Sequence, residues 1–429
     1  MPRKAKNRTM NKLRSIVLNL KNSETFKKIL LWAIVVFLFL YVFSIPSFSA
    51  KKVLNYISYV FVAGIIGCSF LYTFLYLKFP RNKFFVLPLI LVAIGFIGTS
   101  IYLHNFDSYR RWLTLLLMTL TMYAIYLSFL IIDDPRFIMK IIIFAFLAFS
   151  IYFAIVYRKY ILSFNISADL RFEIYFDNVN TLGFYFSILF VMAFYIALTF
   201  KKKRELLYYL AALVFFGLGL FTASRSFILV SIGGAIGVLF LRFKQKKLIF
   251  LIVMVALIIL LVILINSVPF LKDQFDRMLF TVFGLGNSKV DGSTLQRTVW
   301  ANYAFTLGSE NILFGYGVDG FANISGIGTY AHNNFAEMIC DFGIFGIITY
   351  YLMFVVLGAK AFRSKDTNVN FVAVLLFIYF IRSFFGVLYY TKDSYLIFAL
   401  CLYLTKDIEG IIGYREKNLK SNDCYDVYI

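Results

Sequence analysis

Long apolar runs, most of them about 20 residues in length, recur about a dozen times along this chain. Coiled as a helix, a run of that length matches the thickness of the hydrocarbon core of a bilayer. Hydrophobic residues make up 61% of the 429 residues and charged residues only 15%, which leaves too little polar surface to coat a water-soluble globule. The sequence therefore predicts an all-α integral membrane protein with about 12 transmembrane helices.

The apolar runs divide the chain into five parts. A basic segment, 1–27, comes first, and the first nine predicted helices occupy 28–266. A loop of mixed composition follows at 267–337, three more predicted helices occupy 338–406, and a charged tail takes up 407–429. The predicted spans lie at 28–46, 54–78, 84–102, 112–132, 138–157, 179–200, 206–222, 226–242, 248–266, 338–359, 371–390 and 394–406.

Lysine and arginine concentrate in the segments between alternate apolar runs. Two dense clusters lie at 201–204 and 242–247, and the formal net charge of the chain is +21. Because basic loops stay on the cytoplasmic side, beside an anionic leaflet, the pattern predicts a multi-pass protein of the cytoplasmic membrane with both termini in the cytoplasm. The same clustering accounts for the basic balance without nucleic acid, which we do not expect as a partner.

The long loop, 267–337, is predicted to be extracytoplasmic and to contain short helices. The alternation of apolar and charged residues at 269–280 suits a helix on the membrane surface, and 293–307 predicts a second helix. A glycine-rich stretch at 314–320 follows, and the segment 331–337 runs directly into the tenth span. The loop is the main feature of the chain outside the membrane.

Charged residues are rare inside the predicted spans. The first nine spans carry no Asp or Glu in their interiors, which counts against a proton- or sodium-coupled transporter because such proteins use buried carboxylates. A flippase for lipid-linked oligosaccharides would need cations through the spans, but only Arg382 lies deep in one. A structural or signalling membrane protein is the remaining alternative.

Three cationic or titratable side chains share the predicted outer face. Arg225 lies between the seventh and eighth spans, Arg297 lies on the second predicted loop helix, and His332 directly precedes the tenth span. Guanidinium forks bind phosphate oxygens and an imidazole can move a proton near neutral pH, so the set suits a phosphorylated, membrane-anchored substrate. The alternatives are a snorkelling helix end for Arg225, a solvated charge for Arg297 and a structural role for His332. The second histidine, His104, is interpreted as a loop residue.

Two carboxylates, Glu337 and Asp341, are four residues apart and would share one face of the tenth predicted helix. Such a pair could hold a cation or pair with an arginine. Two oxygen ligands are too few to predict a metal site, and we predict neither a metal nor a cofactor.

Short motifs follow one another between 175 and 360. His332-Asn333 is followed, after nine residues, by Gly343-Ile344-Phe345-Gly346, and Arg225 begins the segment Arg-Ser-Phe-Ile-Leu. Gln296-Arg297 with Trp300 precedes the run Leu313-Phe-Gly-Tyr-Gly317, and Asp177-Asn178-Val179-Asn180 precedes the sixth span. In order and spacing these motifs resemble the O-antigen ligase and O-antigen polymerase family of bacterial envelope enzymes. Val179 departs from the proline that such proteins often have at that point.

The resemblance implies a metal-independent glycosyltransferase that moves a glycan from undecaprenyl diphosphate to an acceptor hydroxyl outside the cytoplasmic membrane. Arg225 and Arg297 would bind the donor diphosphate and stabilise the departing charge, and His332 would act as general base. The partners implied are the lipid-linked oligosaccharide and membrane lipids, with a flippase and a chain-length regulator of the same pathway as candidates. Supporting positions in this interpretation are Asn333, Glu337, Gly315 and Gly317.

Polymerases and ligases of this family share motifs and differ in their acceptor. Residue usage rich in Lys, Asn, Ile and Phe indicates an AT-rich genome, common among Gram-positive bacteria, which lack lipopolysaccharide. We therefore favour a polysaccharide polymerase for a capsule, an exopolysaccharide or an O-antigen, acting between two lipid-linked repeat units. A ligase that transfers to lipid A-core or to the cell wall is the alternative.

Overall fold

The structure is a computed structural model, and its regular elements are all helices within the residues that it describes. These residues are 18, 20–47, 52–156, 158, 179–199, 206–222, 224–243, 245–267, 272 and 292–406. Among these described residues, eight helices are long and apolar enough to cross a membrane. The prediction of an all-α integral membrane protein is therefore confirmed, whereas the number of crossings and their orientation stay predictions. The predicted surface helix at 269–280 lies outside the described residues, as do 1–17 and 407–429.

A helix occupies each of the predicted spans. The first half of the chain forms α2 (Glu24–Ser47), α3 (Lys52–Tyr76), α4 (Val86–Gly98), η2 (Thr99–Leu103), α5 (Phe106–Ile132), α6 (Pro135–Val156) and α8 (Val179–Thr199). The second half forms α9 (Leu206–Phe221), α10 (Arg225–Phe243), α11 (Lys247–Ser267), α13 (Gly292–Glu310), α14 (Gly320–Ile324), α15 (Asn334–Arg363), α16 (Thr367–Arg382) and α17 (Lys392–Leu404). Helix α13 confirms the predicted loop helix at 293–307.

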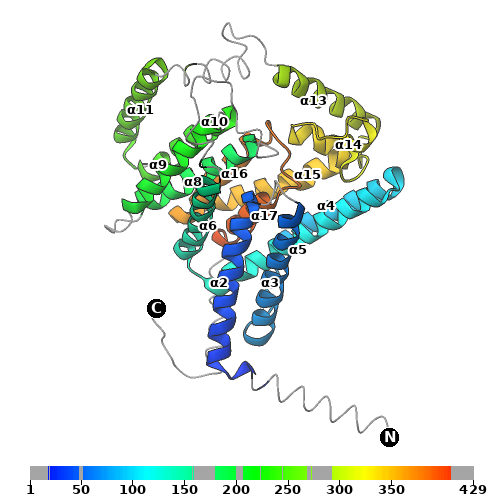
Figure 1. The fold of residues 1–429 in the computed structure, drawn as a ribbon, viewed down its shortest axis with the longest axis horizontal. Coiled ribbons are helices and arrows are strands. Elements are labelled where there is room, and N and C mark those ends of the chain that lie inside the picture. Colours follow the sequence, from blue (N-terminus) through cyan, green and yellow to red (C-terminus); the bar gives the residue numbers. More distant parts are fainter. Residues whose placement is uncertain are drawn as a thin grey trace.

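The helices pack into one bundle through aromatic and small side chains. Helix α8 lies against α9 and α10, α16 against α10 and α15, and α17 against α5 (Figure 1). The rings of Tyr195 and Phe371 stack at a centroid distance of 3.9 Å, and a Cβ on Gly234 would lie 2.3 Å from the side chain of Val191. Lipid is as apolar as these side chains, so close packing rather than burial from water holds such helices together.

The loop helices α13 and α14 gather at one end of the bundle, over the beginning of α15 and beside α4 (Figure 1). Helix α15 is broken near its start, because Gly343 has φ 63° and ψ −165°. The amides of Ile344 and Phe345, which the break releases from the helix, donate to the carbonyls of Ile312 and Leu313. The kink therefore joins the loop to the bundle by main-chain hydrogen bonds.

The predicted span 371–390 is helical only as far as Arg382, and the sequence prediction was wrong for its last residues. Residues 383–391 form turns and irregular backbone. The amides of Leu388 and Tyr389 both donate to Oδ1 of Asn334, which replaces the hydrogen bonds that a helix would have given them. Irregular backbone at this depth is tolerated where it is buried in protein or lines a cavity, and this segment lines a cavity.

Candidate functional site

A cavity of about 340 Å³ lies where the loop helices meet the bundle. It has the size of a small-molecule site and a partly polar lining. The lining combines apolar residues, such as Pro46 and Val387, with backbone and side chains from the irregular segment 383–391. Its charged and titratable residues are Arg111, Arg297, Asp319, His332, Glu337 and Arg382.

Helices α8, α10, α15 and α17 all begin beside the cavity. The lining includes Asn180 in the first turn of α8, Ser226 in that of α10, Glu337 in that of α15, and Thr391, the N-cap position of α17. A helix N-terminus carries a partial positive charge and therefore favours an anion. Three arginines outnumber the two carboxylates of the lining, Asp319 and Glu337, and together with these helix ends they favour an anion in the cavity.

His332 lines the cavity from the segment before α15. Its backbone is left-handed, with φ 57°, a conformation uncommon for a residue with a side chain. Flanking hydrogen bonds fix it: the amide of Ala331 donates to Oε2 of Glu337, and Oδ1 of Asn333 caps α15 by accepting from the amides of Phe335 and Ala336. The imidazole therefore has a defined position at the start of the helix.

Two aromatic rings flank the imidazole of His332. The ring of Trp300 stacks on it at 5.6 Å with an interplanar angle of 15°, and the ring of Tyr330 lies 4.2 Å away. Burial, and secondly the positive charge of Arg297, lower the pKa of His332 from 6.5 to about 4. His332 is therefore neutral at neutral pH and can accept a proton.

Arg297 lies on α13, one turn before Trp300, so both side chains project from the same face of that helix. Arg297 and His332 line one cavity. This is consistent with the sequence prediction that both residues lie on the same face of the membrane. Arg225 is the first residue of α10, and its neighbour Ser226 lines the same cavity. The side chain of Arg225 lies outside the described part of the structure.

The predicted supporting glycines hold the loop on α15. Gly315 and Gly317 have positive φ values of 66° and 97°. The amide of Tyr316 donates to the carbonyl of Cys340 and that of Gly317 to the carbonyl of Asp341. A Cβ on Gly315 would lie 2.4 Å from the backbone of Asp341, and only glycine allows this approach.

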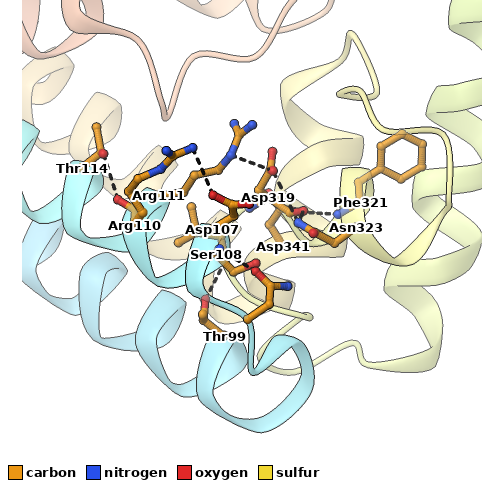
Figure 2. A network of polar contacts seen from close by, with 12 residues as sticks. Thr99, Asp107, Ser108, Arg110, Arg111, Thr114, Asp319, Phe321, Asn323 and Asp341 are labelled. Atoms are coloured by element: carbon orange, nitrogen blue, oxygen red, sulfur yellow. Dashed lines mark hydrogen bonds and ion pairs between the residues drawn. The ribbon is translucent and has the colours of Figure 1, made fainter. Parts of the chain in front are cut away.

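The carboxylate of Asp341 holds the same loop by hydrogen bonds (Figure 2). It accepts hydrogen bonds from the amides of Asp319 and Phe321 and from the hydroxyl of Tyr389. The carboxylate of Glu337 similarly accepts a hydrogen bond from the amide of Ala331. The two carboxylates that the sequence offered as a cation site therefore hold the backbone in place, and no group of three metal-ligating side chains occurs among the described residues.

Sequence reasoning did not assign three further charged residues to the site: Arg111, Asp319 and Arg382. Nε of Arg111, at the start of α5, lies 2.9 Å from Oδ2 of Asp319 (Figure 2). Burial raises the pKa of the Asp319 carboxyl, and Arg111 opposes that rise. Arg382 at the end of α16 forms an ion pair of 2.6 Å with Asp393. An isolated arginine in an apolar run was a signal for Arg382, whereas nothing near Arg111 in the sequence pointed to Asp319.

Residues 210–351 match the family model described as O-antigen ligase. No curated protein matches the chain. The matched segment contains Arg225, Arg297 and His332 and ends within α15, while Arg111 and Arg382 lie outside it. The match and the apolar helices indicate a multi-pass membrane enzyme with activity of the O-antigen ligase or polymerase type. Over this segment, about a third of its length, the chain is similar to the O-antigen ligase family.

Proposed function

We propose that the protein is a polysaccharide polymerase that joins undecaprenyl-diphosphate-linked glycan to a second lipid-linked repeat unit. The match of residues 210–351 to the O-antigen ligase model supports a lipid-linked oligosaccharide as substrate. The observation that carries the residue assignment is the meeting of Arg297 and His332 in one cavity, beside the start of α10 where Arg225 lies. Its positive lining suits a diphosphate, and its volume leaves room for part of a sugar.

In the proposed reaction, an acceptor hydroxyl attacks the anomeric carbon of the donor glycan. The new bond joins the acceptor oxygen to that carbon, and the bond from carbon to the diphosphate oxygen breaks. The diphosphate leaves with the bonding electrons, where Arg225 and Arg297 stabilise its charge. His332 takes the acceptor proton as general base.

The negative charge of the bound donor should raise the pKa of His332 toward the value that suits a general base. In the empty site, Arg297 helps to lower the pKa of the imidazole. A bound diphosphate neutralises much of the Arg297 charge and adds negative charge of its own, so the pKa of His332 rises when the donor is present. A base whose pKa lies nearer the working pH takes up a proton more readily.

We place the cavity on the outer face of the cytoplasmic membrane, with both termini inside. The helix ends around it belong to the loops that carry few basic residues, in agreement with the distribution of Lys and Arg. Reagents that label cysteine only from outside test this orientation: Cys substituted at Ser325, in the loop, should react in intact cells. Cys substituted at Lys365, between α15 and α16, should react only after permeabilisation.

A lengthening assay tests the reaction itself. Purified protein receives one undecaprenyl-diphosphate repeat unit as both donor and acceptor, and products are separated by length on a gel. The wild type should build a ladder, and His332→Ala, Arg225→Ala and Arg297→Ala should each abolish it while the protein still folds. Wild-type ladders from all three variants would end the residue assignment. Transfer only to an added lipid A-core or cell-wall acceptor would identify a ligase, and transport across vesicles without bond formation a flippase.

A further inference from the structure

Arg382 is a buried cation that the reaction proposed above does not use. It is the last residue of α16, it is 5% exposed, and it lines the same cavity as Arg297 and His332. A guanidinium keeps its charge under any physiological condition and carries five N–H donors. Charge of this kind inside an apolar bundle is costly, so its partners indicate what it is for.

The protein holds one edge and one face of this guanidinium. Nη1 lies 2.6 Å from Oδ2 of Asp393, which also accepts from the hydroxyl of Tyr379 at 2.9 Å. The guanidinium carbon lies 3.8 Å from the centre of the Phe184 ring, close enough for a cation–π contact. The ring of Tyr185, at 6.0 Å, is a more distant neighbour.

The remaining donors of Arg382 have no acceptor in the described part of the chain. Asp393 is the one residue there that accepts a hydrogen bond from the guanidinium. Because Arg382 lines the cavity, its unused N–H groups are available to a molecule bound there. The ion pair and the ring fix the orientation of the group in advance, so little reorganisation is needed on binding.

We propose that Arg382 is a third guanidinium for the donor, binding the diphosphate of the lipid-linked substrate. The inference rests on the proposed function and adds a residue outside the matched family segment. Phosphate oxygens accept the paired N–H groups of a guanidinium better than single sugar hydroxyls do. Asp393 positions the arginine without occupying all of its donors.

Binding of lipid phosphates without any sugar tests this directly, because no catalysis is involved. Protein in detergent is titrated with undecaprenyl diphosphate, undecaprenyl monophosphate and inorganic pyrophosphate. The wild type should bind undecaprenyl diphosphate most tightly. Arg382→Gln should weaken that binding about tenfold or more, and Arg382→Lys less, since Lys keeps the charge and loses the fork. Arg363→Gln, an exposed control in the last turn of α15, should bind as the wild type does.

A second variant separates binding from folding. Arg382→Gln leaves Asp393 buried without its cation, so the single variant can also lose stability. Combining it with Asp393→Asn restores a neutral hydrogen-bonded pair. The double variant should elute and melt as the wild type does and still bind undecaprenyl diphosphate weakly, with a smaller preference for diphosphate over monophosphate. A double variant that kept wild-type affinity and preference would overturn the proposal.

The remaining results distinguish this proposal from the proposed function. His332→Ala should keep diphosphate binding and lose chain lengthening. If Arg297→Gln binds weakly while the Arg382 variants bind normally, the role of Arg382 is wrong and the polymerase assignment stands. If the wild type neither binds undecaprenyl diphosphate nor lengthens chains, the proposed function itself fails. Inorganic pyrophosphate binding as tightly as the lipid would overturn the assignment of the site to a lipid-linked donor.

Discussion

Replacing Arg297 by Gln should raise the pKa of His332. Burial and Arg297 together lower that pKa from 6.5 to about 4, which makes protonation of the imidazole more costly by about 3 kcal/mol. Burial is the larger cause, so Arg297 accounts for less than half of this cost, about 1 kcal/mol. The variant should therefore titrate at a higher pH than the wild type but still below 6.5, because burial continues to lower the pKa.

The chain offers a simple way to measure this titration, because it contains only two histidines. The other, His104, ends η2 in a left-handed conformation with φ 46°, which Asn tolerates well. In a His104→Asn background, the imidazole resonances seen by NMR between pH 4 and 7.5 belong to His332 alone. Arg297→Gln, compared in that background, should shift the titration toward higher pH, and adding undecaprenyl diphosphate to the unsubstituted Arg297 protein should do the same.

The pH dependence of activity and of stability follows from which protonation state of His332 is active and which one the folded protein favours. The neutral imidazole is the active base, so lengthening measured at low substrate should begin to fall at a higher pH in any Arg297 variant with residual activity. The folded site also resists a proton that the unfolded chain accepts near pH 6.5, so the folded state loses stability as the pH falls from 6.5 to 4. A His332 pKa that stayed the same or fell in Arg297→Gln would refute the electrostatic link between the two residues.

The structure makes further predictions about how the loop is held. Gly343→Ala should lower stability by about 3 kcal/mol, because φ 63° with ψ −165° suits only glycine and a Cβ would lie 2.4 Å from the backbone of Leu313. Thermal melting measures this loss, with Gly358→Ala as the matched control, since the nearest atom to a Cβ there is 3.9 Å away. Asp341→Asn should cost about 2 kcal/mol and reduce lengthening, since the amide cannot serve all three donors, and unchanged melting and activity would contradict that role. Arg111→Gln should change stability by less than about 1 kcal/mol, because the Arg111 side chain is 45% exposed. A larger loss in denaturant titration would show that the ion pair with Asp319 stabilises the fold more than its exposure implies.

The helices could be predicted from sequence because each needs a long apolar run, and the bilayer sets that length. The end of α16 could not. Residues 384–390 are as apolar as a span, yet the amides of Leu388 and Tyr389 bind the side chain of Asn334, more than 50 residues away in the chain. A competing partner at that separation leaves no mark on local composition. The approach of Arg111 to Asp319 was hidden for the same reason.

The candidate site was predictable to the extent that topology determines it. Placing Arg225, Arg297 and His332 on one face needed only the number of spans between them, and Arg297 and His332 do line one cavity. Sequence could not tell that the carboxylates of Glu337 and Asp341 are taken up by backbone amides. Oxygen ligands for a cation and acceptors for amides are the same residue types, and only the fold decides between them.

The spacing from His332 to Gly343 now has a physical explanation. Asn333 caps the intervening helical segment, and Gly343 ends it where the loop docks by main-chain hydrogen bonds. Between these points, Glu337 and Asp341 each accept amides of the loop that carries the imidazole. The left-handed backbone of His332, which is uncommon for a residue with a side chain, should relax if these contacts are lost. Most residues of the motif therefore act through the position of one side chain, and variants at Asn333, Glu337 and Gly343 should converge on the same defect: a protein that still binds diphosphate and transfers no sugar.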